Sequence, residues 1–212
     1  MEQQGPPPFA SLDEVTQRIL SCPDCALSSS RTRAVPGEGP PNPLVMLVGE
    51  GPGFHEDQQG RPFVGAAGRF LEQLLQLAGL ERGQVFITNV VKCRPPNNRD
   101  PLPGEVRACA KYLQAQIHFL QPRVIVTLGR HSLAWFFPNE SVTRARGKPR
   151  QWNGITVVPM LHPAAALHQQ QYRRTIEEDF RQLPAILQRA LAERQPRAAP
   201  TPPPQQLSMF DL

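Results

Sequence analysis

Residues 44–53 read LVMLVGEGPG, a short apolar run that leads directly into a turn of glycine and proline. A run of this length bounded by turn residues is typical of a strand that is buried on both faces of a parallel sheet. Three later runs have the same form, at residues 85–91, 124–129 and 155–160. We therefore expect four parallel strands at the centre of the fold.

Helical patterns lie between and around these runs. Ser11 and Glu14 fit a capping box that begins a helix ending near Leu20. Apolar residues recur at helical spacing in residues 67–78, which Gly79 is suited to end, and in residues 103–120. Further helices are expected from residue 130 through Trp135 and over residues 175–192. Alternating strands and helices predict an α/β fold of three layers, α/β/α, with a central parallel four-stranded sheet.

Proline marks the two ends of the expected domain. The 212 residues include 25 prolines, and a group of them falls near the C-terminal end of the sequence. We expect a disordered leader over residues 1–10 and one domain over residues 11–191. An extended Pro-rich linker is expected over residues 192–205, followed by a short terminal segment over residues 206–212.

Composition limits the class of protein. The formal net charge of +5 suits a polyanionic partner without identifying one. No run of 18 apolar residues is present, and the first residues lack the pattern of a signal peptide, so we expect no membrane span and a cytoplasmic location. No dimer-forming stretch stands out, and a monomer is expected.

Polar and aromatic side chains follow the expected strands. Glu50 comes after the first strand, Asn89 ends the second, and His162 follows the fourth; Phe63 lies in the loop after the first. Ligands of such sheets bind outside the carboxyl ends of the strands, so these side chains are expected to meet. An aromatic face can stack on a planar base, an amide can pair with its edge, and histidine can donate to a developing anion. Each residue alone has an ordinary structural interpretation, and the combination favours a base-binding site.

The chain contains four cysteines, which we interpret as one metal site. Cys22 and Cys25 form a C-x2-C pair, while Cys93 follows the second strand and Cys109 lies on the next expected helix. Zinc and a [4Fe–4S] cluster both accept four thiolates, so the spacing leaves the identity of the metal open. The alternative is that Cys93 and Cys109 are small core residues.

Taken together, these motifs resemble the family 4 uracil-DNA glycosylases. The matching pieces are the C-x2-C pair, residues 49–53 (GEGPG), 60–65 (GRPFVG) and 87–96 (ITNVVKCRPP), Cys109, and His162 with Pro163. The resemblance implies the uracil-DNA glycosylase fold, a [4Fe–4S] cluster on the four cysteines, and release of uracil from single- or double-stranded DNA as the start of base-excision repair. It places the uracil site on Gly49, Glu50, Gly51, Phe63, Asn89 and His162.

The resemblance also suggests roles for these residues. Phe63 would stack on the uracil, Asn89 would pair with its edge, and His162 would donate to O2 of the departing anion. Related families place an aspartate where this chain has Gly51, so Glu50 is the candidate that positions water. Glu56 is expected near the ring edge that carries the methyl group of thymine.

Basic residues and the terminal segment suggest further contacts. We expect the basic loop residues Arg94, Arg99, Arg144, Arg146, Lys148 and Arg150 to meet phosphates. The segment Gln206, Leu207, Ser208, Met209 and Phe210 resembles the short peptide by which bacterial repair proteins hold the replication sliding clamp, with Met209 in place of leucine. The alternative is a tail that folds back on the domain or has no function.

Three other functions remain open at this point. A relative could capture uracil-containing DNA without turnover through a histidine in the loop after the second strand, but residues 94–100 contain no histidine. The chain could instead be a zinc-stabilised nucleotide-binding module. A third possibility is a related enzyme that prefers hypoxanthine or another damaged base.

Overall fold

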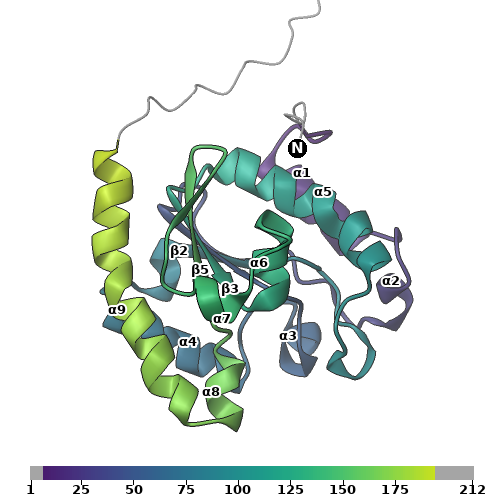
Figure 1. Ribbon diagram of the computed structural model, residues 1–212. Coiled ribbons are helices and arrows are strands. Elements are labelled where there is room, and N and C mark those ends of the chain that lie inside the picture. Colours follow the sequence, from purple (N-terminus) through teal and green to yellow (C-terminus); the bar gives the residue numbers. More distant parts are fainter. Residues whose placement is uncertain (1–6, 194–212) are drawn as a thin grey trace, which may run out of the picture.

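The computed structural model describes residues 7–193 and places a five-stranded sheet between two layers of helices (Figure 1). The strand order is β2-β1-β3-β5-β4. Four strands are parallel: β1 (Val45–Gly49), β2 (Val85–Asn89), β3 (Val124–Leu128) and β5 (Ile155–Met160). They match the four predicted strands to within two residues at each end. The α/β/α fold with a central, mostly parallel sheet is therefore confirmed.

The prediction of only four strands was wrong, because β4 (Arg150–Trp152) pairs antiparallel with β5 at one edge. Asn153 and Gly154 connect the two strands, with φ of 48° and 76°. Two consecutive residues with positive φ form the two-residue hairpin turn that Asn-Gly favours. This dipeptide was the sequence signal for the fifth strand.

Each face of the sheet carries its own core. On one face, Leu47 of β1 packs with Leu71 of α4 (Ala66–Leu77) and Phe180 of α9 (Gln171–Ala192). On the other face, Met46 packs with α1 (Leu12–Leu20) and α5 (Pro103–Leu120). Figure 1 shows these two pairs of helices on opposite sides of the strands. Neighbouring residues of β1 thus face opposite cores, which explains why the whole strand is apolar.

The predicted long helices are confirmed with small shifts of their ends. The side chain of Ser11 accepts from the backbone N–H of Glu14 at the start of α1, and Gly79 has the positive φ expected after α4. The closing helix α9 begins at Gln171, four residues earlier than expected. Short helices complete the described chain: α2 (Leu27–Ser30), α3 (Phe54–Gln59), α6 (Arg130–Phe136), α7 (Val142–Ala145), α8 (Ala164–His168), η1 (Arg82–Gln84) and η2 (Pro96–Asn98).

The predicted terminal segments lie largely outside the described residues. This applies to residues 1–6 of the expected leader, to the linker from residue 194 onward and to the terminal segment at residues 206–212. Phe9 is described, and its ring stacks on Tyr112 with the ring centroids 5.8 Å apart. Among the described helices, none is long and apolar enough to cross a membrane.

Candidate active site

The candidate site lies at the carboxyl ends of the parallel strands. β1 and β3 are neighbours, and the chain leaves them toward opposite edges of the sheet, to β2 on one side and β5 on the other. Such a switch point is the usual place for a ligand in an open α/β sheet. Gly49 and Asn89 are opposite each other at the ends of β1 and β2, and His162 comes two residues after β5. The sheet therefore brings these predicted residues to one edge.

Phe63 and Asn89 both lie against the backbone of Gly49. A Cβ atom added to Gly49 would lie 2.3 Å from Oδ1 of Asn89 and 2.8 Å from Cζ of Phe63. Both side chains therefore need the space that glycine leaves. Asn89 is 2% exposed, and its Oδ1 has no hydrogen-bond partner in the described part of the chain. An unpaired buried acceptor is costly, and a bound ligand with a donor would satisfy it.

His162 lies against Phe63 as a neutral hydrogen-bond donor. Its ring stacks against Phe63 with the centroids 5.6 Å apart and the planes 28° apart. The backbone N–H of Ala164 donates to Nδ1 of His162 at 3.1 Å, so the ring proton belongs on Nε2. Burial lowers the pKa of His162 to about 4, although part of the residue reaches solvent. The imidazole is thus neutral at physiological pH and can donate from Nε2.

The backbone of Phe63 is held in an unusual conformation. Its φ is 52°, in the left-handed region that residues other than glycine rarely adopt. Gly68 of α4 approaches closely, since a Cβ atom there would lie 1.9 Å from the carbonyl oxygen of Phe63. The guanidinium of Arg82 donates to the carbonyl of Phe63 at 3.1 Å and to that of Pro62 at 2.6 Å. These contacts fix the aromatic ring at the pocket.

Glu56 binds the backbone of the loops around the pocket. One carboxylate oxygen accepts from the N–H groups of Val64 and Gly65 at 2.8 and 2.9 Å, and the other accepts from Gly53 at 3.1 Å. We expected Glu56 at the edge of the bound base. That expectation stays a prediction, and the contacts show that Glu56 joins the turn after β1 to the loop that carries Phe63.

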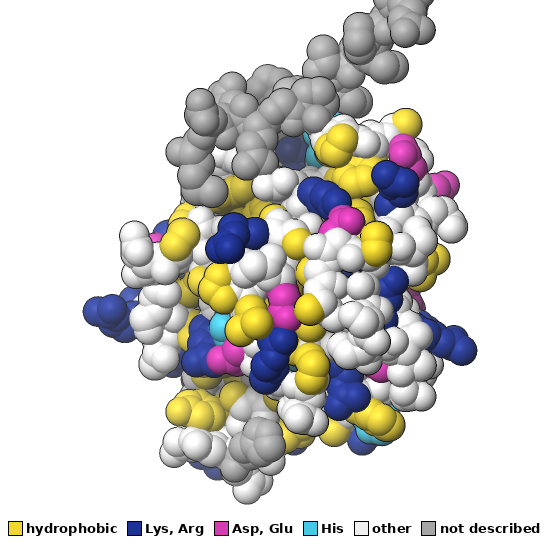
Figure 2. All heavy atoms as spheres, turned by 90° about the vertical axis from the view of Figure 1, so that its right-hand side faces the viewer, with side chains coloured by type: hydrophobic (Ala, Val, Ile, Leu, Met, Phe, Trp, Pro, Cys, Tyr) yellow, Lys and Arg dark blue, Asp and Glu magenta, His cyan; other side chains and the backbone are white. Residues whose placement is uncertain are grey.

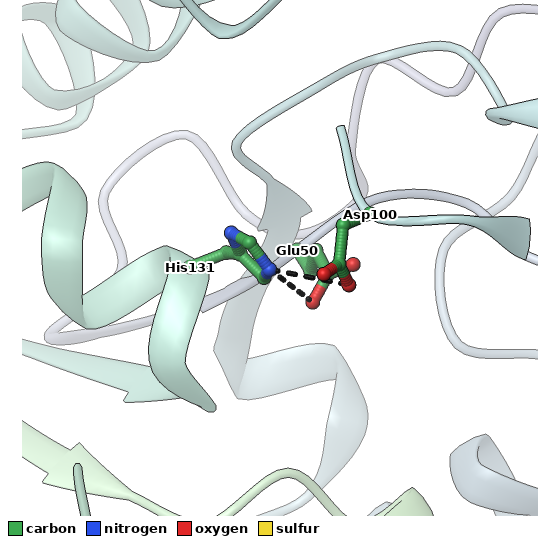
Figure 3. A group of neighbouring side chains, drawn as sticks. All are labelled: Glu50, Asp100 and His131. Atoms are coloured by element: carbon green, nitrogen blue, oxygen red, sulfur yellow. Dashed lines mark ion pairs between the residues drawn. The ribbon is translucent and has the colours of Figure 1, made fainter. Parts of the chain in front are cut away.

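The carboxylate of Glu50 faces a group of charged residues that the sequence analysis did not select. Its Oε2 lies 3.8 Å from Nε2 of His131, and the same nitrogen lies 3.3 Å from Oδ1 of Asp100 (Figure 3). Burial raises the pKa of Glu50, and Asp100 raises it further, while His131 and Arg130 oppose the shift. Gly51, the next residue, packs its backbone against Val91.

Glu50, Asp100 and His131 each offer a ligand atom, and these atoms all lie within 4.8 Å of one another. A metal ion would have to compete with Arg130. Its Nε lies 3.1 Å from Nε2 of His131, and its Nη2 pairs with Asp100. The guanidinium of Arg130 therefore already occupies the Asp100 side of this group.

The four cysteines line one cavity between α1, α5 and the turn after β2. Cys22, Cys25, Cys93 and Cys109 are all free thiols that line this small cavity. Two donors are aimed at their sulfurs: Nη1 of Arg31 lies 3.0 Å from Sγ of Cys93, and the N–H of Lys92 lies 3.3 Å from Sγ of Cys109. Burial raises the pKa of Cys109 to about 12, so a thiolate there requires a bound cation.

The distances between the cysteine sulfurs distinguish a site for one zinc ion from a site for a larger metal cluster. Four thiolates around one zinc, with Zn–S bonds of about 2.3 Å, would lie roughly 3.8 Å apart. Among the described residues, only Glu50, Asp100 and His131 form a group of three or more possible ligand atoms within 4.8 Å of one another. No three of the cysteine sulfurs therefore lie that close together. The cysteine sulfurs are therefore spread more widely than one zinc ion requires.

Lys92 connects the cysteine cavity to the base pocket. It is 1% exposed, and its Nζ donates to Oγ1 of Thr88 at 2.6 Å, to the carbonyl of Asn89 at 2.7 Å and to Oε1 of Gln116 at 2.7 Å. Burial lowers the pKa of Lys92 to about 7. The sequence signal that could have revealed this role is a lysine placed in the otherwise apolar run before Cys93.

Several of the basic residues expected to meet phosphates are engaged within the chain. Arg99 forms a two-point ion pair with Glu105, Arg146 pairs with Asp179 at 2.7 Å, and Arg150 lies 3.3 Å from Glu140; Arg94 donates to Asn98 and lies over the ring of Phe54. On the face drawn in Figure 2, Lys and Arg side chains are scattered among acidic and hydrophobic ones. The basic side chains on that face therefore do not form one uniform patch.

Comparison with known proteins identifies the family. The profile of the uracil DNA glycosylase superfamily matches residues 36–183, which include the whole sheet and every pocket residue described above. The chain belongs to the uracil DNA glycosylase superfamily.

Three relatives named Type-4 uracil-DNA glycosylase match most of the chain. The protein of Sulfurisphaera tokodaii is 51% identical over 183 residues, which cover 82% of this chain and 83% of the relative. The protein of Saccharolobus solfataricus is 46% identical, with coverage of 84% and 87%, and that of Thermotoga maritima is 43% identical, with coverage of 84% and 95%. The resemblance drawn from the motifs is therefore confirmed at the level of the family.

Proposed function

We propose that this chain is a monofunctional uracil-DNA glycosylase, which hydrolyses the N-glycosidic bond of deoxyuridine in DNA and releases uracil for base-excision repair. Its Type-4 relatives support the activity. The observation that carries the assignment is the buried, unpaired Oδ1 of Asn89, which lies beside Phe63 at the end of β1. A donor on a planar base would satisfy this oxygen.

Recognition follows from the chemistry of the pocket. A base in duplex DNA has to leave the stack before it can enter, or it has to be presented in a single strand. Phe63 supplies an aromatic face, and the amide of Asn89 accepts from N3–H of uracil while it donates to O4. Cytosine has an acceptor at N3 and a donor at C4, so it would leave both amide atoms unpaired. Each unpaired buried group costs about 1–3 kcal/mol.

Bond cleavage needs a donor for the anion and a nucleophile for the sugar. The bond between the sugar carbon and N1 breaks with its electron pair on the base, and Nε2–H of His162 donates to O2 of the resulting anion. The oxygen of water then bonds to the sugar carbon. Glu50 is our candidate for the group that orients this water and takes its proton.

We propose that the four cysteines hold a [4Fe–4S] cluster. The donor set of four free thiols, their spread around one cavity and the donors aimed at Cys93 and Cys109 support a cluster rather than a single zinc ion. The cluster would act as a structural cross-link and take no part in the reaction. It would tie the segment after α1 to the turn after β2 and to α5.

We also propose that residues 206–212 bind the replication sliding clamp. Leu207, Met209 and Phe210 form an apolar group after a Pro-rich stretch, and they lie outside the described residues. A linker of about 13 residues in polyproline II conformation would reach roughly 40 Å, which lets a monomeric glycosylase domain act while tethered. Deletion of residues 206–212 should abolish binding to the clamp and leave cleavage of a free oligonucleotide unchanged; clamp affinity that survives the deletion would refute the proposal.

The experiment that tests the enzymatic function is a glycosylase assay on a single-stranded oligonucleotide with one uracil, followed by alkali to break abasic sites. We expect wild-type protein to cleave and Asn89→Ala and His162→Ala to lose most of the rate. Asn139→Ala and His118→Ala, on exposed positions, serve as matched controls and should retain it. Tight binding by the cluster-loaded wild type without any cleavage would favour a capture protein instead.

A further inference from the structure

Three segments that are distant in sequence meet at the Glu50 carboxylate. Glu50 lies in the turn after β1, Asp100 lies between η2 and α5, and Arg130 and His131 begin α6. Figure 3 shows the His131 ring turned toward the carboxylates of both Glu50 and Asp100. Nε2 of His131 lies 3.8 Å from Glu50 and 3.3 Å from Asp100, and Arg130 contacts both His131 and Asp100.

We infer that Asp100, Arg130 and His131 are positioning residues that hold the Glu50 carboxylate at the mouth of the base pocket and set its charge for the attack of water. The inference rests on the proposed glycosylase function. It adds three residues to the machinery of the site, and none of them is a member of the uracil-binding set.

The position of α6 supports this role. Gly129 lies between β3 and α6 with φ of 96°, and a Cβ atom there would lie 3.2 Å from Cβ of His162. Its N–H donates to the carbonyl of Met160 at 2.9 Å, which ties the start of α6 to the strand that leads to His162. The next two residues are Arg130 and His131. One short turn therefore joins the start of α6, which carries Arg130 and His131, to the segment that carries His162.

Stability alone does not explain the network. Side chains of Arg130 and Asp100 are 67% and 57% exposed, and ion pairs with that exposure contribute little to folding. The Glu50 side chain is less exposed, at 32%, and burial is the main cause of its raised pKa. The charged groups that face it act in opposite directions, because His131 and Arg130 lower its pKa and Asp100 raises it.

These opposite signs give a sharp test. If Glu50 acts as a carboxylate, the cleavage rate falls when it is protonated at low pH. Removal of His131 raises the pKa of Glu50, so the acid limb of the rate profile should move to higher pH. Removal of the Asp100 charge lowers that pKa, so the limb should move to lower pH. We expect shifts of roughly half to one pH unit, because the groups are partly screened by solvent.

The experiment is a set of single-turnover cleavage rates between pH 4.5 and 8.5, with full-length, cluster-loaded protein in excess over a uracil-containing single strand. His131→Gln and Asp100→Asn are compared with wild type, with Glu50→Gln, and with the double variant of Glu50→Gln and Asp100→Asn. Arg181→Gln and Asp13→Asn are controls on distant, exposed positions. Inhibition by free uracil is measured for each variant as a readout of the base pocket.

We expect Glu50→Gln to lower the rate about 100-fold and to remove the acid limb, with no further effect of Asp100→Asn in that background. Inhibition by free uracil should stay within about twofold of wild type in His131→Gln and Asp100→Asn. Unchanged acid limbs, shifts in the same direction, or a shift that persists without Glu50 would overturn the inference. A wild type that binds the strand and never cleaves it would instead refute the proposed function.

Discussion

Oδ1 of Asn89 lies 2.3 Å from the point that a Cβ atom on Gly49 would occupy. That Cβ atom would also lie 2.8 Å from Cζ of the Phe63 ring. The end of β1 is thus a surface against which both base-contacting side chains rest, and its shape depends on the missing side chain of one glycine.

Gly49→Ala should therefore abolish base binding. The added methyl group displaces Asn89 and Phe63 together, and we expect the cleavage rate to fall at least about 100-fold, as misplaced groups in an active site commonly cause. Gly83→Ala, where a Cβ atom meets nothing within 4 Å, is the matched control. Single-turnover cleavage measures the effect, and a Gly49→Ala protein with wild-type activity would contradict the geometry.

Protonation of His162 should destabilise the protein in acid. The unfolded chain binds this proton near the ordinary histidine pKa of about 6.5, whereas the folded chain binds it only near pH 4. The stability that the neutral ring contributes is therefore complete above pH 6.5 and is lost as the pH falls toward 4. We expect urea unfolding at pH 4.5 and 7 to show an acid loss of about 1–3 kcal/mol that is smaller in His162→Gln.

His162→Gln also tests the donor role. The glutamine amide can donate a hydrogen bond where alanine cannot, so His162→Gln should retain more cleavage activity than His162→Ala. Equal loss of rate in the two variants would indicate that the imidazole acts in another way. The comparison is best made at pH 7, where the wild-type ring is neutral.

Glu56→Gln should loosen the loop that carries Phe63. The carboxylate accepts three backbone N–H groups, and the amide of glutamine offers only one oxygen and places donors against donors. We expect unfolding to become easier by about 1–3 kcal/mol and inhibition by free uracil to weaken. Glu178→Gln, at an exposed position of α9, is the control. Unchanged affinity for free uracil would remove Glu56 from the support of the pocket.

Arg31→Lys should weaken retention of the proposed cluster. Arg31 donates to Sγ of Cys93 at 3.0 Å and to the carbonyls of Cys22 and Leu20, and one lysine ammonium cannot reproduce that fork. We expect faster loss of visible absorbance and iron during incubation with a chelator, by roughly tenfold. Arg33→Lys, an exposed neighbour, controls for the change of residue type. Equal rates of iron loss would show that Arg31 has no such role.

Neutralisation of Arg144 and Lys148 should reduce the salt dependence of DNA binding. Both residues are exposed beside Arg146, which is paired with Asp179. Each lost phosphate contact lowers the slope of log K against log salt by about 0.7 to 0.9. We expect the variant with Arg144→Gln and Lys148→Gln to lose about one unit of slope or more, whereas Arg174→Gln with Arg181→Gln on α9 should not. An unchanged slope would remove this segment from the interface.

The sequence predicted those parts of the molecule that depend on local pattern. Apolar runs that end in turns located the four parallel strands, and the rule that ligands bind at strand ends brought Asn89 and His162 to one site. Phe63 was predicted through its motif, although its left-handed backbone conformation was not. The fifth strand was missed because three residues carry no periodicity, and the Asn153-Gly154 turn was its only signal.

The network around Glu50 could not be predicted in the same way. Asp100 comes from a loop whose path is set by η2 and the start of α5, and its meeting with His131 is a result of tertiary packing. Likewise, Arg146 and Arg150 read as free surface charges in sequence, but Asp179 and Glu140 come to them from other elements. Contacts between loops that are distant in the chain produce no periodic pattern in the sequence, so sequence patterns cannot predict them.

Lys92 has a consequence for anyone who redesigns this protein. Its backbone N–H donates to Cys109, and its ammonium holds the carbonyl of Asn89. To graft this site onto a scaffold without cysteines would remove the hydrogen bond from the Lys92 backbone to Cys109, while its side chain kept its contact with the carbonyl of Asn89. The cysteine cavity and Asn89 are therefore coupled through a single residue, and a change at Cys109 is expected to reach the strand end that carries Asn89.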